Sequence, residues 1–219
     1  MSTVLAARAD ALRDISKPFP AVPNPYTQET MDYLWTPWRY AYFTDAEIDH
    51  GRRGVPKELA AWPGDLGCIF CNLLASTEYA ITHGQAEEEA ERSAHILLRT
   101  EHAFVCLNLF PYTSGHLMIL PRVHQSSLAA LDAQIAFKMT TLAQRAESVL
   151  REVYSPHGLN LGLNLGQAAG AGVAAHVHLH VLPRWIGDAN FMSVVGETRV
   201  LPETLDTTWE RLRPGFQRG

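Results

Sequence analysis

The stretch that decides the fold runs from residue 176 to residue 185 and reads HVHLHVLPRW. Its three histidines are His176, His178 and His180. Apolar and β-branched residues alternate with them up to Pro183, so we predict a strand over residues 177–185. Side chains two residues apart on a strand share a face, which would place the three rings side by side. Such a row can position a nucleophile, hold a metal ion or bind an anion; the alternative is a polar face that only meets solvent.

Segments on both sides of this strand predict the rest of a sheet. We expect two short strands within residues 95–110, joined by a turn near Arg99–Glu101. A further strand is expected over residues 116–124, ending at Pro121, and another over residues 157–166.

A long helix is predicted between the last two of these strands. Asp132 can cap it, and apolar residues recur at spacings of three and four until about Tyr154. A second helix is expected over residues 200–213, with Pro202 in its first turn. The order β-β-β-α-β-loop-β predicts an α+β fold, in which a largely antiparallel sheet carries a long packed helix.

The N-terminal part of the chain lacks such regular patterns. Residues 1–30 hold four prolines and suggest an arm, and the aromatic segment YLWTPWRYAYF follows. Residues 49–66 are expected to form a loop, and residues 76–93 a solvated loop or a short helix. We therefore divide the chain into an N-terminal arm with an aromatic extension (1–60) and a domain that ends in a C-terminal helix (61–219).

Composition excludes several classes of function. The chain has 219 residues, a net charge of -5 and a pI near 6.0, without the basic surface that nucleic acids require. No apolar stretch reaches the roughly 18 residues of a membrane span. The N-terminus lacks the apolar core of a secretory signal, and three cysteines argue against a disulfide scaffold. We expect a cytoplasmic protein with neither nucleic-acid nor membrane partners.

Two cysteines separated by two residues, Cys68 and Cys71, form a possible metal-binding pair. Such a pair can share a tetrahedral Zn²⁺ whose remaining ligands are histidines from elsewhere in the chain. A thioredoxin-like redox pair and ordinary core cysteines are the alternatives, although the βαβ pattern of the redox fold is missing. Cys106 lies in a predicted strand and is expected to be a small buried apolar residue.

The loop before the histidine strand reads NLGQAAGAGVAA and spans residues 164–175. Its small residues let the backbone approach a ligand and offer N–H groups to an anion. By itself this is a weak signal, but it directly precedes three histidines that can act on a phosphate. A neutral imidazole is nucleophilic at neutral pH and can attack phosphorus.

Together these motifs resemble the histidine triad (HIT) family. The matching segments are GCIFCNLL, LNLFPYTSGHLMILPRVH, and GLNLG followed by AGAGVAAHVHLHVLPRW, within residues 66–196. PRWIGDANF and YLWTPWR are most similar to the bacterial branch that includes the actinobacterial diadenosine tetraphosphate phosphorylases. The resemblance implies a HIT-like sheet, a nucleotide or dinucleoside polyphosphate substrate, and a homodimer.

The same resemblance assigns the catalytic histidines. His178 matches the family nucleophile, which takes up the nucleoside monophosphate as a covalent intermediate. His180 matches the partner that contacts phosphate and leaving group. Gln holds that place in the uridylyltransferase branch, so His180 disfavours sugar-nucleotide transfer. His116 matches a structural histidine.

A zinc site is also implied. His176 matches a metal ligand of the zinc-bearing members, and Cys68, Cys71 and His124 would complete the set. Four protein ligands make a closed, structural site, and the chemical step needs no metal.

The residues that the resemblance assigns to nucleotide and phosphate binding are Asn108, Asn164, Ala171, Gly172, Val173 and Trp185. Asn108 matches a ribose contact and Asn164 a group near the α-phosphate. Trp185 and Asn190 resemble the longer signature of the phosphorylase-like branch, and core or interface packing is the alternative for Trp185. Hydrolase members carry a Ser or Thr hydroxyl just before the triad. Residues 171–175 have none, so backbone N–H groups would replace it.

The function implied is cleavage of (di)nucleoside polyphosphates at the α-phosphorus through a phosphohistidine, with phosphate or water as acceptor. A nucleoside phosphoramidate hydrolase is one alternative, because an amine leaving group needs less help from a hydroxyl. The others are a nucleotide-binding regulatory module with little turnover and a zinc-stabilised interaction domain.

Overall fold

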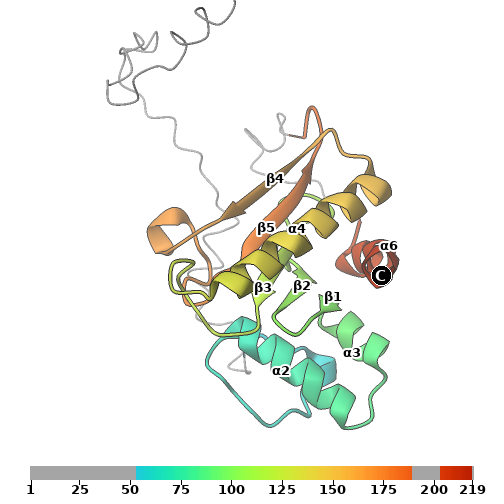
Figure 1. The fold of residues 1–219 in the computed structure, drawn as a ribbon. Helices are drawn as coiled ribbons and strands as arrows, with labels where there is room; N and C mark the ends of the chain where they lie inside the picture. The colour runs from blue at the N-terminus through green and yellow to red at the C-terminus, as the bar shows by residue number, and fades with distance from the viewer. Residues whose placement is uncertain (1–52, 189–202, 219) are drawn as a thin grey trace, which may run out of the picture. The chain divides into compact units, whose positions relative to one another are not determined.

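A five-stranded antiparallel sheet in the order β1-β2-β3-β5-β4 forms the centre of the fold (Figure 1). The computed structural model describes residues 53–188 and 203–218. The strands are β1 (Ile96–Arg99), β2 (Ala103–Leu107), β3 (Leu117–Pro121), β4 (Gly158–Leu163) and β5 (Leu179–Arg184). All five lie within the predicted ranges, and the α+β prediction is confirmed.

The long predicted helix is α4 (Ala133–Tyr154), which lies across one face of the sheet (Figure 1). The Asp132 side chain accepts the N–H groups of Gln134 and Ile135, so it caps the helix as predicted. The chain leaves the helix at Ser155, which has a φ of 46°. The remaining elements are α2 (Ile69–Thr82), α3 (Glu87–Ser93), α6 (Leu205–Gln217) and the 3₁₀ turns η2 (Lys57–Leu59) and η3 (Gln167–Ala169). None of the helices in residues 53–188 and 203–218 is long and apolar enough to cross a membrane.

Alternation along the strands divides the apolar residues between two clusters. Leu97, Val105, Ile119 and Val181 face α4 and α6 in one cluster. Their neighbours pack against α2 and α3 in the other. These neighbours include Ile96, Phe104, Cys106, Met118 and Leu120. Cys106 is fully buried, as expected of a small apolar residue.

The histidine strand is shorter than the prediction of residues 177–185. β5 begins at Leu179, because its ladder with β3 ends at the pair Ile119↔Leu179. Before that point the Val177 N–H donates to the carbonyl of Gln125 at 2.6 Å, so the chain pairs with a loop instead of a strand. All three histidines are nonetheless buried, at 1%, 5% and 8% exposure, which overturns the alternative of a solvent-facing polar strand.

Of the two alternatives for residues 76–93, the short helix is confirmed by α3, and the end of α2 also lies there, because apolar residues such as Phe70 and Leu74 give α2 a buried side. Two other expectations are corrected. The expected loop over residues 49–66 holds the 3₁₀ turn η2. The C-terminal helix begins after its cap Thr204 and continues to Gln217, since Trp209, Leu212 and Phe216 all insert into the core. Pro202, Asn190 and the N-terminal segment up to residue 52 lie outside the described residues.

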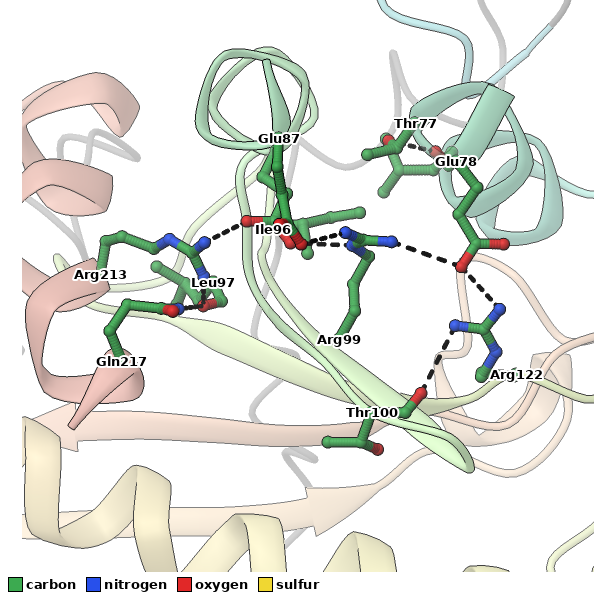
Figure 2. Close-up of polar contacts among 12 residues, drawn as sticks. Thr77, Glu78, Glu87, Ile96, Leu97, Arg99, Thr100, Arg122, Arg213 and Gln217 are labelled. Carbon is green, nitrogen blue, oxygen red and sulfur yellow. Dashed lines mark hydrogen bonds and ion pairs between the residues drawn. The ribbon is translucent and has the colours of Figure 1, made fainter. Parts of the chain in front are cut away.

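Ion pairs connect α2 and α3 to the sheet and to α6 (Figure 2). Glu91 on α3 is 2% exposed and binds Arg213 of α6 and Nε of Arg99, the latter at 2.8 Å. Glu78 on α2 lies 3.5 Å from Arg99 and 2.6 Å from Arg122, which follows β3. A buried carboxylate is tolerated only when it is paired, so Glu91 fixes α3 between two arginines.

Candidate active site

Four segments meet around the three histidines: the first turn of α2, residues 108–116, residues 121–125 after β3, and the entry to β5. The register Met118↔His180 places β3 beside the triad. The start of α2 lies against the rings of His176 and His178 through Phe70, which is itself 6% exposed.

His178 has the arrangement that a nucleophilic imidazole needs. Its Nδ1 lies 2.8 Å from the carbonyl oxygen of His176. A carbonyl only accepts, so Nδ1 carries the proton and Nε2 keeps its lone pair. Burial lowers the pKa of His178, which keeps the ring neutral at pH 7. The ring can therefore attack an electrophile through Nε2.

A hydrogen-bonded chain sets the proton on His180. The backbone N–H of Tyr112 donates to Nδ1 of His116 at 3.1 Å, so the proton of His116 is on Nε2. Nε2 of His116 lies 3.0 Å from Nδ1 of His180 and donates to it. His180 then carries its own proton on Nε2, where it can donate to a phosphoryl oxygen or a leaving group.

His116 and Tyr112 were missed as parts of this arrangement by the sequence prediction, which gave His116 a structural role only. His116 is 1% exposed and is bonded directly to one of the predicted catalytic histidines. Its position after the turn PYTSG gives no signal that it reaches a residue 64 positions away. Asn108, predicted to contact ribose, lies with Nδ2 3.4 Å from both ring nitrogens of His116, and its Oδ1 accepts the N–H of Phe110.

The four predicted metal ligands come together. The ligand atoms of Cys68, Cys71, His124 and His176 all lie within 4.8 Å of one another. Nδ1 of His176 is 3.5 Å from Sγ of Cys68 and 3.6 Å from Sγ of Cys71, and Nδ1 of His124 is 3.4 Å from Sγ of Cys71. In a tetrahedral zinc site the metal-ligand distances place sulfur and nitrogen about 3.6 Å apart. The donor set and its spacing therefore fit Zn²⁺.

The surroundings of these ligands also suit a cation. Nε2 of His176 donates to the carbonyl oxygen of Pro121 at 3.0 Å, which leaves Nδ1 as the lone-pair atom facing the sulfurs. Burial lowers the pKa of His176 to about 4. Burial, together with the neighbouring Cys68, raises the pKa of Cys71 to about 12. A bound divalent cation would supply the charge that thiolates need here.

The predicted phosphate-binding loop passes through η3 just before the triad. Gly166 and Gly170 take φ values of 84° and 85°, which residues with a side chain rarely adopt. The N–H of Ala171 donates to the carbonyl of Gly166, so the loop is closed by its own backbone. Gly172 is exposed, and the side chain of Val173 packs against the α2 cluster. Asn164 follows the last residue of β4.

Trp185 lies on the side of the sheet away from the triad. Its ring stands edge-on to Tyr154 of α4 at 6.2 Å. Its backbone N–H donates to the carboxylate of Asp188, which also pairs with Arg184. These contacts give Trp185 the packing role, and its contact with nucleotide stays a prediction.

Comparison with known proteins agrees with the fold and identifies the family. The family model of the HIT domain matches residues 89–185. An AP-4-A phosphorylase of Mycobacterium tuberculosis is 32% identical over 191 residues, which cover 87% of this chain and 87% of that protein. The chain belongs to the histidine triad family.

Solved structures show the same fold. A Zn-bound histidine triad family protein from Mycobacterium smegmatis has a TM-score of 0.52 and 25% identity, covering 71% of this chain and 96% of that one. A hypothetical histidine triad nucleotide-binding protein from Sulfolobus tokodaii has a TM-score of 0.51 and 19% identity, covering 68% and 92%.

Proposed function

We propose that this protein is an enzyme that cleaves dinucleoside polyphosphates, such as diadenosine tetraphosphate, at the α-phosphorus by double displacement. One observation carries the proposal: the protons of the two histidines are fixed in complementary places. His178 has its lone pair on Nε2, and His180 has its proton on Nε2. A nucleophile and a hydrogen-bond donor therefore stand side by side, with ring centroids 4.8 Å apart.

In the first step Nε2 of His178 forms a bond to the α-phosphorus, and the bond from that phosphorus to the bridging oxygen breaks. The positive charge on the His178 ring is stabilised by the carbonyl of His176, which accepts its Nδ1–H. The Nε2–H of His180 donates a hydrogen bond to the departing phosphate oxygen, which leaves as an anion while His180 keeps its proton. Backbone N–H groups of Gly172 and Val173 bind the phosphoryl oxygens, in place of the missing hydroxyl.

In the second step an oxygen of phosphate or water attacks the phosphorus, and the P–N bond breaks with its electron pair returning to Nε2 of His178. The proton of the attacking group passes to solvent. Phosphate would release a nucleoside diphosphate, and water a nucleoside monophosphate. The named activity of the M. tuberculosis relative supports phosphate as the acceptor. Asn108 contacts the ribose in this proposal, and Asn164 the α-phosphate.

The test is incubation with diadenosine tetraphosphate, with and without inorganic phosphate, followed by chromatography. ADP and ATP in equal amounts, formed only with phosphate, would establish phosphorolysis. AMP and ATP without phosphate would establish hydrolysis. Two molecules of ADP without phosphate would contradict attack at the α-phosphorus.

A nucleoside phosphoramidate hydrolase is the second candidate, favoured by the absence of any hydroxyl in residues 171–175. It predicts release of AMP from an adenosine phosphoramidate with no turnover of the tetraphosphate. No turnover of either substrate, with nucleotide still bound, would instead indicate a regulatory binding module.

Structural zinc at Cys68, Cys71, His124 and His176 is part of the proposal, supported by the donor spacing and by the Zn-bound relative from M. smegmatis. Zinc would link the start of α2 to His124 and His176. With four protein ligands it has no open position for substrate. Elemental analysis should find about one zinc per chain in the purified protein. Cys71→Ser should lose it, and the buried non-ligand variant Cys106→Ala should keep it.

A cytoplasmic homodimer completes the proposal. β4 is at the edge of the sheet, carries no charged residue, and exposes 47% of Leu161. An uncharged edge strand is a template for pairing with another chain, and a second copy is the occupant that we propose. Light scattering should show a dimer, and Leu161→Lys should shift it to monomer. A monomeric wild-type protein would contradict this assignment.

A further inference from the structure

Phe70 is a buried aromatic residue that stands between the two cysteines of the candidate metal site. It lies in the first turn of α2 and is 6% exposed. Its ring centroid is 5.2 Å from that of His178, with the planes tilted by 55°. The centroid of the His176 ring is 5.6 Å away, and that ring stands nearly perpendicular, at 84°. Phe70 therefore contacts the nucleophile and a metal ligand with the same ring.

His176 connects the same two sites through its own backbone. Its Nδ1 faces the two sulfurs, and its Nε2 donates to Pro121. Its carbonyl oxygen accepts the Nδ1–H of His178 at 2.8 Å. Contacts that fix the ring of His176 therefore also fix the backbone carbonyl that orients His178. The metal site and the nucleophile are thus joined by one backbone hydrogen bond and one ring contact.

We propose that Phe70 is a positioning residue for His178, and that the Cys68–Cys71 turn carries the effect of metal binding to the nucleophile through this ring. Cysteine ligation fixes the first turn of α2, so Phe70 closes one side of the His178 ring. The carbonyl of His176 fixes the edge of the same ring at Nδ1. With one side and one edge held, His178 keeps the orientation that aims Nε2 at phosphorus. The kinetic part of this inference rests on the proposed function.

A role in filling space makes a different prediction, and Phe104 is the matched control. Phe104 of β2 is fully buried in the same apolar cluster. If Phe70 only fills volume, Phe70→Leu and Phe104→Leu should both lower the melting temperature and leave turnover unchanged. If Phe70 positions His178, Phe70→Leu should lower kcat about tenfold with KM nearly unchanged, because misorientation of a reacting group acts on the chemical step. Phe70→Tyr keeps the ring and should restore most of kcat.

The experiment combines these kinetics with imidazole nitrogen NMR on the full-length protein. The His178 signal is assigned with His178→Asn and recorded with zinc bound and after chelation. We expect one tautomer, protonated on Nδ1, in the zinc-bound wild type. Averaged shifts are expected in zinc-bound Phe70→Leu and in the chelated wild type. Unchanged shifts in both, or equal kcat in Phe70→Leu and Phe104→Leu, would overturn the inference.

This design separates the inference from the proposed function. If the wild type turns over no nucleotide, the proposed function fails, but the shifts still report whether Phe70 and the metal hold the His178 ring. If chelation unfolds the protein, the His178 shifts of zinc-bound Phe70→Leu alone test the inference.

Discussion

The two faces of the sheet are made by the same strands but hold their side chains in place by different means. On the α4 face, residues such as Leu97, Val105 and Val181 form a continuous apolar cluster. On the other face the apolar cluster under α2 and α3 gives way to histidines at β5. The first face depends mainly on packing, with one buried hydrogen bond from the Trp209 ring N–H to the carbonyl of Ile96, whereas the second also depends on which atom of each ring carries a proton.

This dependence on proton positions explains why the histidines of the second face are linked to one another and to the backbone by hydrogen bonds. A buried polar group that loses its partner costs about 1–3 kcal/mol, so each ring must find one inside the protein. His178 finds the carbonyl of His176, and His180 finds His116, which in turn accepts from the backbone of Tyr112. Orientation for catalysis and satisfaction of buried groups are met by the same bonds. Substitutions on the two faces should therefore separate activity from stability.

The largest effect is expected from His178→Asn. It removes the ring that we propose attacks phosphorus while keeping a polar side chain, so kcat should fall by about 10⁴-fold, as losses of a nucleophile do. Stopped assays of diadenosine tetraphosphate cleavage measure kcat, and calorimetry measures the affinity for AMP, which should stay close to that of wild type. More than a hundredth of wild-type turnover in this variant would assign the nucleophile elsewhere.

Leu97→Ala tests the opposite face. Leu97 is fully buried in β1 against α4 and α6, and truncating a buried leucine costs about 3 kcal/mol of unfolding free energy. Urea denaturation should show this loss, and kcat at a temperature where the variant is folded should equal that of wild type. A matching fall in kcat would show that the two faces are not independent.

The hydrogen-bonded chain behind His180 is tested by His116→Leu. The variant removes the N–H that fixes the proton of His180, so kcat should fall about 10²-fold, as the loss of one hydrogen-bond donor to the transition state does. His116→Gln keeps a donor and an acceptor and should recover part of the loss. In the double variant with His180→Ala the effects should not add, since both act on one proton. Additive losses would mean that His116 acts independently of His180.

The elements that could be predicted from the sequence are those with a local period. The alternation of apolar and polar residues predicted β5 and its neighbouring strands. The cap at Asp132, together with apolar residues at spacings of three and four, predicted α4. α2 was not predicted, because the pair Cys68 and Cys71 was interpreted as a metal motif and the helix that starts there was overlooked.

For the candidate site, sequence motifs predicted which residues take part but not which of them contact one another. The triad, the C-x-x-C pair and His124 were named from the sequence, and the structure brings the four predicted ligands together. The bond between His116 and His180 follows from the β3–β5 register, in which Met118 pairs with His180, and no local pattern sets that register. Phe70 was missed for the same reason, since the rings that it contacts, His176 and His178, lie more than a hundred residues away in the sequence.

The smallest effect is expected from Gly162→Val, which tests where the leaving group lies. Gly162 of β4 is paired with His180 and so points to the same face. A Cβ there would meet no heavy atom within 4 Å. Valine suits a strand, so the melting temperature should not fall. Its methyl groups would occupy space beside His180, and kcat/KM for diadenosine tetraphosphate should drop about tenfold, or 1.4 kcal/mol. Gly158→Val is the control, because Gly158 is equally open but pairs with Arg184 at the other end of the strand. Equal losses in both variants, with the dimer intact by light scattering, would mean that the leaving group runs along the whole of β4, and no loss in either would place it on the other side of His180.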